Sequence, residues 1–214
     1  MFTNTNSCYK IKLTVVSLNT ASQKDIGIQG DIMSEKISKD EIVNAVLKTT
    51  FYKSAGATSL NDIASELGIK KASLYNHFAS REEIFDYTSD ACSEYMNEIS
   101  FKPGDIEAVT NKYTPVIVLK GMVNRYFKMH EKAPLFQIYT FVESTKYFSS
   151  KSADIVKAEK AKLISQTEEI LTALVNAGKI SITAMDVKSA ATWFCSAIRD
   201  FLSQYLLERK QLVI

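Results

Sequence analysis

Glycine and proline are scarce in this chain, whose 214 residues include only seven glycines and three prolines. Both residues end helices and form tight turns, so their scarcity leaves few places where a helix has to stop. The long segments between them carry apolar residues at three- and four-residue spacing, which is the period of a helix with one buried side. The sequence therefore predicts an all-α fold.

Cysteine and histidine are also rare, with three cysteines and two histidines in the whole sequence. Cys8, Cys92 and Cys195 are odd in number, lie far apart and form no CxxC pair, which argues against a disulfide framework and against a zinc site. The histidines, His77 and His130, do not stand in a cluster with cysteines and carboxylates. We therefore expect free thiols, no bound metal and no cofactor.

The sequence has no apolar run long enough to span a membrane. The best candidate, residues 11–18, is interrupted by Lys12 and falls far short of the roughly 20 apolar residues that a span requires. The first residues also lack the charged start, apolar middle and small-residue cleavage site of a secretory signal. We expect a globular, cytoplasmic protein with no membrane partner. Its net charge of +2 neither demands nor excludes a polyanionic partner.

Motifs for common enzyme chemistry are missing as well. The sequence contains no G-x-S-x-G elbow, no P-loop and no dinucleotide-binding glycine pattern. An active site for acyl transfer also needs a nucleophile, a base and a group that orients the base, and the two histidines offer little for this purpose. We therefore expect that the chain is not an enzyme.

The first strong helix signal begins at Ser38. Ser38 and Glu41 have the spacing of a capping box, in which a hydroxyl and a carboxylate bond the free N–H groups of the first helical turn. The helix is expected to run to about Ser54, and Gly56 is expected to supply the positive φ that ends it.

A helix-turn-helix pattern follows this first helix. Thr58 or Ser59 can cap a second short helix, and Gly68 stops that helix after barely two turns. Two short helices that cross at a steep angle need a small residue at the crossing, and Ala64 supplies it. A third short helix is then expected to start near residue 70, with Leu74 buried beneath it. A helix of this length can enter the major groove of DNA.

The run ATSLNDIASELGIKKASLYNHFASREEIF, from Ala57 to Phe85, resembles the signature of the tetracycline-repressor (TetR) family. Its most distinctive part is LYNHF, residues 74–78, and the clear resemblance covers residues 38–87. The resemblance implies a DNA-binding transcription regulator, usually a repressor. Such a regulator binds double-stranded operator DNA as a homodimer and leaves it when a small organic ligand binds.

The resemblance also implies roles for individual residues of the helix-turn-helix. Phosphate contacts fall on four residues, which are Ser59, Tyr75, His77 and Arg81. Contacts to base edges fall on five, which are Lys70, Lys71, Ala72, Ser73 and Asn76. Two positions depart from the usual pattern, since Ala72 stands where the family often has glycine and Arg81 where it often has lysine.

The chemistry of these side chains agrees with the implied roles. A hydroxyl at a helix N-terminus, a phenol and a cation all suit phosphate oxygens. Lysine can bond the acceptors of guanine, asparagine can pair with adenine, and the Ala72 methyl can touch thymine. Each lysine taken alone is more simply a solvated surface charge, and a lone tyrosine or histidine is more simply a half-buried polar residue. Their combination with Ala64 and Gly68 favours a DNA-reading surface.

Further helices are expected at 82–99, 115–131, 133–147, 152–177 and 186–209, which together would form one bundle. The first of them would connect the DNA reader to the bundle, and its tilt would be the lever that a ligand moves. The apolar stripe of the last helix is broader than one neighbour would bury, which favours a two-fold four-helix interface with a second copy. The alternative is that this helix lies wholly inside the core.

Aromatic residues of the bundle offer candidates for a ligand site. Tyr126, Tyr139 and Trp193 each combine a flat apolar face with one hydrogen-bonding atom, so we expect a small, rather hydrophobic organic effector. Two alternatives to a ligand-controlled regulator remain at this point. One is a DNA binder without ligand control, which a solid bundle core would favour, and the other is a helical protein-interaction module.

These observations divide the chain into three parts. Residues 1–32 are rich in Thr, Ser and Asn and are expected to form a poorly ordered extension, with Met33 as an alternative start of the chain. Residues 33–81 are expected to form the DNA-binding domain, and residues 82–214 the domain for ligand binding and dimerisation.

Overall fold

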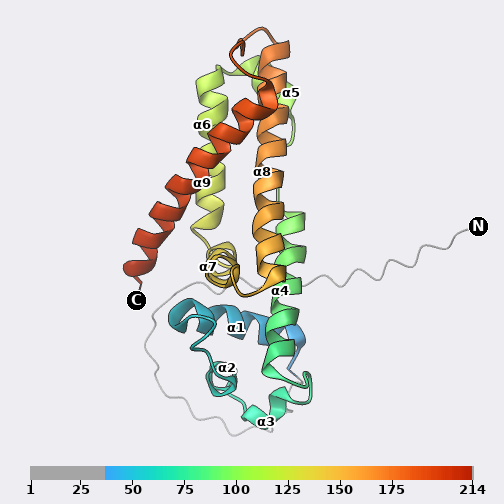
Figure 1. Cartoon of the computed structure of the whole chain (residues 1–214), viewed down its shortest axis with the longest axis vertical. Helices are drawn as coiled ribbons and strands as arrows, with labels where there is room; N and C mark the ends of the chain where they lie inside the picture. Colours follow the sequence, from blue (N-terminus) through green and yellow to red (C-terminus); the bar gives the residue numbers. More distant parts are fainter. Residues whose placement is uncertain (1–36, 214) are drawn as a thin grey trace, which may run out of the picture.

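The computed structural model describes residues 37–213, and all regular structure in this range is helical. The expected N-terminal extension, residues 1–32, lies outside the described residues. Helices α1 to α3 form one end of an elongated molecule and helices α5 to α9 form the other, with α4 running between them (Figure 1). The predicted all-α fold is confirmed.

Helix α1 (Lys39–Lys53) begins with the expected capping box, in which Glu41 N–H donates to the Ser38 hydroxyl and Ser38 N–H donates to the Glu41 carboxylate. The helix ends at Lys53, as expected, but the prediction that Gly56 supplies the positive φ after it is wrong. The positive φ belongs to Ser54, at 71°, and the only glycines of the described chain with positive φ are Gly68 and Gly178.

Helices α2 (Leu60–Glu66) and α3 (Lys71–Leu74) form the helix-turn-helix. Gly68 has a φ of 67° between them, a conformation that costs glycine little because it has no Cβ. The small residue Ala64 is buried where the helices approach each other, together with Ile63 and Leu74. The local pattern in the sequence therefore predicts this unit well.

Helix α4 (Arg81–Glu98) packs against α1 at its start and against α8 (Ser150–Asn176) along its length. Its last carbonyl groups lack partners within the helix, as at every helix end. Lys162 of α8 fills this gap, because its ammonium donates to the carbonyls of Met96, Asn97 and Ile99 at 2.8, 2.9 and 2.8 Å. One side chain thus fixes the C-terminal end of α4 to the bundle.

The bundle also contains α5 (Ile106–Lys112), α6 (Pro115–His130), α7 (Leu135–Thr145) and α9 (Val187–Gln211). The sequence predicted α6 to α9 within a few residues but missed α5. Asp105 caps α5, whose seven residues are too few to show a clear helical period. No helix in the described part of the chain is long and apolar enough to cross a bilayer.

A buried polar network joins α6, α7, α8 and α9. The Glu159 carboxylate accepts a hydrogen bond of 2.6 Å from the Tyr126 hydroxyl and is ion-paired with Arg199. Arg199 also pairs with Glu143, and Glu143 in turn pairs with Lys146. Burial raises the pKa of Glu159, whereas the charge of Arg199 acts in the opposite direction. The bundle core is therefore held by paired charges as well as by apolar contacts.

Arg199→Met is expected to destabilise the fold because it leaves the buried Glu159 carboxylate without its cation. The loss should be about 3 kcal/mol in the free energy of unfolding, measured by urea denaturation at one fixed protein concentration. Lys157→Met is the matched control, because Lys157 and Asp154 form an ion pair on the same bundle with side chains 76% and 72% exposed. The control should lose less than about 1 kcal/mol. Equal losses in the two variants would contradict a stabilising role for the network.

Candidate nucleic-acid interface and inner cavity

Helices α1 to α3 make up the proposed DNA-binding domain, which we call the reader. Its third helix, α3, presents its polar residues to the solvent. Leu74 and Phe78 are buried, while five neighbouring residues are exposed, namely Lys70, Lys71, Ala72, Tyr75 and Asn76. Ser73 and His77 are half-buried. The structure therefore brings seven of the nine residues predicted to contact DNA together on one surface, around a helix of four residues.

Most cations of the reader are already engaged with other groups. Lys48 pairs with Glu66 and Lys53 with Asp62, each at 2.5 Å. Lys39 lies over the rings of Phe78 and Tyr87. Lys70 and Lys71 are different, because within residues 37–213 neither of them forms an ion pair or lies over an aromatic ring. The unpaired lysine charges of the reader are thus concentrated at the start of α3, where they are available to a polyanion.

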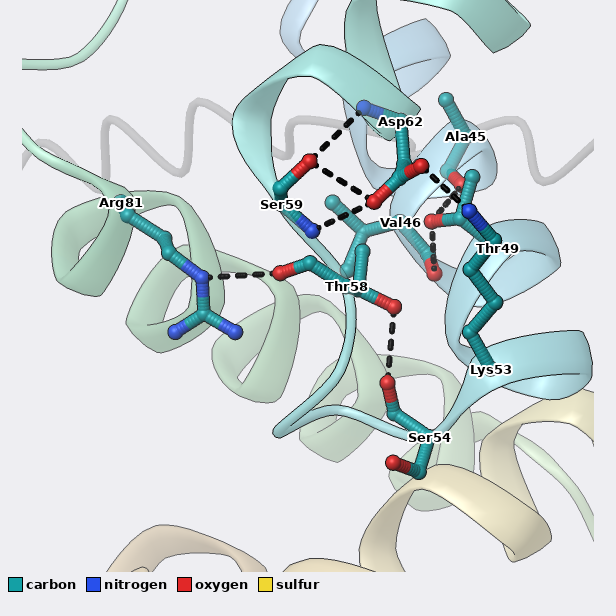
Figure 2. A network of polar contacts seen from close by, with 9 residues as sticks. All are labelled: Ala45, Val46, Thr49, Lys53, Ser54, Thr58, Ser59, Asp62 and Arg81. Atoms are coloured by element: carbon teal, nitrogen blue, oxygen red, sulfur yellow. Dashed lines mark hydrogen bonds and ion pairs between the residues drawn. The ribbon is translucent and has the colours of Figure 1, made fainter.

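Ser59 forms the N-cap of α2 and is tied to Asp62, as Figure 2 shows. Its hydroxyl donates to the Asp62 carboxylate at 2.7 Å, and its N–H donates to the same oxygen at 2.8 Å. Lys53 and then Ser59 hold the pKa of Asp62 far below its usual value, so this carboxylate is ionised at neutral pH. A phosphate at the N-terminus of α2 would therefore lie next to the Asp62 carboxylate, whose negative charge is compensated by Lys53.

Arg81 points into the protein and holds the loop in front of α2 (Figure 2). Its Nε donates to the Thr58 carbonyl at 3.0 Å, and one terminal nitrogen donates to the Ala55 carbonyl at 2.5 Å. The guanidinium also lies 4.0 Å from the centre of the Phe85 ring. This geometry supports a role in positioning the loop, which differs from the phosphate contact that the sequence predicted for Arg81.

The three residues predicted to bind a ligand are not brought together. Tyr126 and Tyr139 both pack edge-on against the ring of His130, at 4.4 and 5.7 Å between ring centres. Trp193 instead lies on α9 with 74% of its surface exposed, so it does not take part in an interior site. The helical period placed Trp193 on the broad apolar stripe but could not tell an outer face from the core.

A small inner cavity lies beside His130, between α4, α6, α7 and α8. Its lining combines apolar side chains such as Met96 and Ile138 with the polar side chains of His130, Tyr139 and Glu159. Its free volume of about 10 Å³ leaves room for about one water molecule. A larger groove of about 300 Å³ lies nearer the other end of the bundle, between the residue 101–103 segment, α5 and α6.

Comparisons with known proteins agree with the reader and the fold. Residues 51–88 match the family model of "Bacterial regulatory proteins, tetR family". The chain is also 39% identical over 61 residues to the biofilm operon icaADBC HTH-type negative transcriptional regulator IcaR of Staphylococcus aureus. That match covers 28% of this chain and 33% of the relative, so the chain spans about a third of the length of this curated relative.

Solved structures share the architecture at low sequence identity. The fatty acid degradation regulator FadR of Bacillus halodurans is 15% identical with a TM-score of 0.55, over 80% of this chain and 85% of that one. SmeT, the repressor of the Stenotrophomonas maltophilia multidrug efflux pump SmeDEF, is 16% identical with a TM-score of 0.54, over 82% and 81%. Residues 51–88 of the chain are thus similar to the tetR family of bacterial regulatory proteins, and the whole described chain shares the fold of these solved structures.

Proposed function

We propose that this chain is a transcription regulator that binds operator DNA as a homodimer and loses affinity for it when a small molecule enters the bundle. The observation that carries the proposal is the surface around α3, where Lys70 and Lys71 are exposed and unpaired within the described chain beside exposed Tyr75 and Asn76. Repression is the proposed mode, because IcaR is a negative regulator and SmeT a repressor.

The DNA contacts are proposed residue by residue. Contacts to base edges involve five residues at the start of α3 and just beyond it, which are Lys70, Lys71, Ala72, Ser73 and Asn76. Tyr75 and His77 would bond phosphate oxygens, and phosphate contacts fix the register of the protein on the duplex. Ser59 would do the same only by turning its hydroxyl from Asp62 to the phosphate. Arg81 is proposed to act through the loop that it holds and not through a phosphate.

The dimer is proposed to form through α8 and α9. Trp193, Phe201 and Leu207 of α9 are 74%, 66% and 56% exposed in the single chain. Their spacing places all three on one side of the helix, and an exposed apolar stripe of this kind marks a protein interface. A second copy related by a two-fold axis would cover the stripe and place two α3 helices on successive major grooves, about 34 Å apart.

Ligand control is proposed to work through α4. This helix connects the proposed DNA-binding domain, residues 33–81, to the proposed domain for ligand binding and dimerisation, residues 82–214. Arg81 at its start is bonded to the loop before α2, while Met96 near its end lines the inner cavity. A ligand that moves α4 would therefore shift the reader, and two readers that no longer match their grooves bind DNA less tightly.

A DNA binder without ligand control is the second candidate. The small size of the inner cavity favours it, because about 10 Å³ does not admit an organic molecule unless a wall moves. Binding of a DNA fragment from beside the gene of this protein, measured with and without added small molecules, separates the two candidates. Tight binding that no compound reduces supports the second candidate. No binding at low salt by a folded dimer would contradict both of them for that fragment.

Lys71→Ala is expected to weaken operator binding, because the lysine is proposed to bond a base acceptor. The expected loss is about 1–3 kcal/mol in binding free energy, with relaxed preference at one base pair of each half-site. Fluorescence anisotropy with a set of singly substituted operators measures both effects. Lys120 is exposed on α6, in the bundle, so Lys120→Ala serves as the matched control and should bind like the wild type. A loss that is the same for every operator base would contradict base readout by Lys71.

Arg81→Gln is expected to weaken operator binding without changing its salt dependence. A residue that neutralises a phosphate contributes about 0.9 to the slope of log K against log salt, so two lost contacts per dimer would lower that slope by about 1.8. A residue that positions a loop changes the affinity at every salt concentration alike. A slope reduced by the amount for two phosphates would show that Arg81 contacts DNA, against the geometry described above.

A further inference from the structure

His130 carries an unusual buried atom. Its side chain is fully buried at the end of α6, and its Nε2 is the only buried side-chain nitrogen or oxygen in the described chain that has no hydrogen-bond partner. Buried polar groups are almost always bonded, because leaving one unpaired costs the desolvation of that group. An unpaired atom of this kind, on a residue that lines a cavity, calls for a partner that comes from outside the chain.

The bonding of the other ring nitrogen fixes what that partner must be. Nδ1 of His130 lies 2.8 Å from the Tyr126 carbonyl oxygen, which can only accept, so Nδ1 carries the proton. Burial lowers the pKa of His130 to about 4, so the ring is neutral at neutral pH. Nε2 therefore presents a bare lone pair, and only a hydroxyl or an N–H group can satisfy it.

The charges around the cavity are already balanced. Glu159 accepts from the Tyr126 hydroxyl and pairs with Arg199, while Glu143 pairs with Arg199 and with Lys146. Two carboxylates thus face two cations, and a charged ligand would bring a buried charge without a partner, which is costly. The cavity selects against carboxylates and ammonium groups.

The remaining walls are apolar and include one adaptable residue. Leu135, Ile138, Val142 and Ile155 supply branched side chains, and Met96 supplies the α4 side of the cavity. Methionine is unbranched and repacks more easily than its neighbours. A ligand larger than water would therefore displace Met96 first and press on α4.

We propose that the cavity beside His130 is the effector site and that its ligand is a small, neutral, mainly apolar molecule with a hydroxyl or N–H group that donates to Nε2 of His130. This inference rests on the proposed function for the consequence of binding, but not for the binding itself. Phenols and indoles are the simplest compounds of this class.

The two histidines of the chain make the test direct. In a ¹⁵N-histidine-labelled full chain, His77 in the reader is an internal reference and His130 reports on the cavity. Phenol and indole are titrated against their methylated partners, anisole and 1-methylindole, which keep the ring and lose the donor. We expect saturable movement of the His130 Nε2 signal with phenol or indole, about tenfold weaker binding of the methylated partner, and no movement of His77.

Two variants locate the site. His130→Phe keeps an aromatic ring and removes the acceptor, so it should abolish the preference for the donor compound. Gly121→Leu fills the separate 300 Å³ groove, because Gly121 lines that groove and a Cβ there meets nothing within 4 Å. This control should bind the probe like the wild type.

Several outcomes would overturn the proposal. A His130 signal that neither phenol nor indole moves would show that the cavity holds water only. Equal binding of the methylated partners, or binding lost in Gly121→Leu, would place the ligand elsewhere. A probe that moves the His130 signal but leaves operator binding unchanged would support the site and contradict the ligand control in the proposed function.

Discussion

The structure depends on helix α4 being held at both of its ends. At its start, the Arg81 guanidinium donates to carbonyls of the loop that precedes α2, and at its end Lys162 donates to three unpaired carbonyls. A helix is stiff along its axis because each turn is bonded to the next. A displacement of its bundle end would therefore be transmitted to the loop between α1 and α2, and α4 is the proposed mechanical link between the cavity and the DNA-binding surface.

A second link joins the bundle to the reader through α9. The Lys210 ammonium donates to the Phe51 carbonyl, near the end of α1, and lies 3.4 Å from the centre of the Phe51 ring. Phe51 also packs edge-on against Phe136 of α7, at 5.0 Å between ring centres. Because α9 also carries the exposed apolar stripe, the helix that forms the proposed dimer interface is the same helix that contacts the reader. The orientation of the two readers would thus depend on both α4 and α9.

Sequence reasoning succeeded where short-range patterns decide the structure. The capping box at Ser38 and the turn at Gly68 involve residues within a few positions of each other, and both are present. It failed where the partner is distant, since Arg81 meets carbonyls 23 and 26 residues away. The unpaired Nε2 of His130 was also invisible, because no sequence pattern reports which buried atom lacks a partner. The breadth of the apolar stripe on α9 favoured an interface, but periodicity could not show that Trp193 lies on its exposed side and away from the core.

If α4 transmits the state of the bundle to the reader, Lys162→Met should change operator affinity. This variant releases the bundle end of α4 without touching the DNA surface, and Lys157→Met on the exposed side of α8 is the control. Operator affinity is measured over a salt series, with hydrogen exchange as a check that the α4 end has loosened. We expect a several-fold change in affinity for Lys162→Met alone, with an unchanged salt slope. Wild-type affinity in a variant whose α4 end has demonstrably loosened would contradict it.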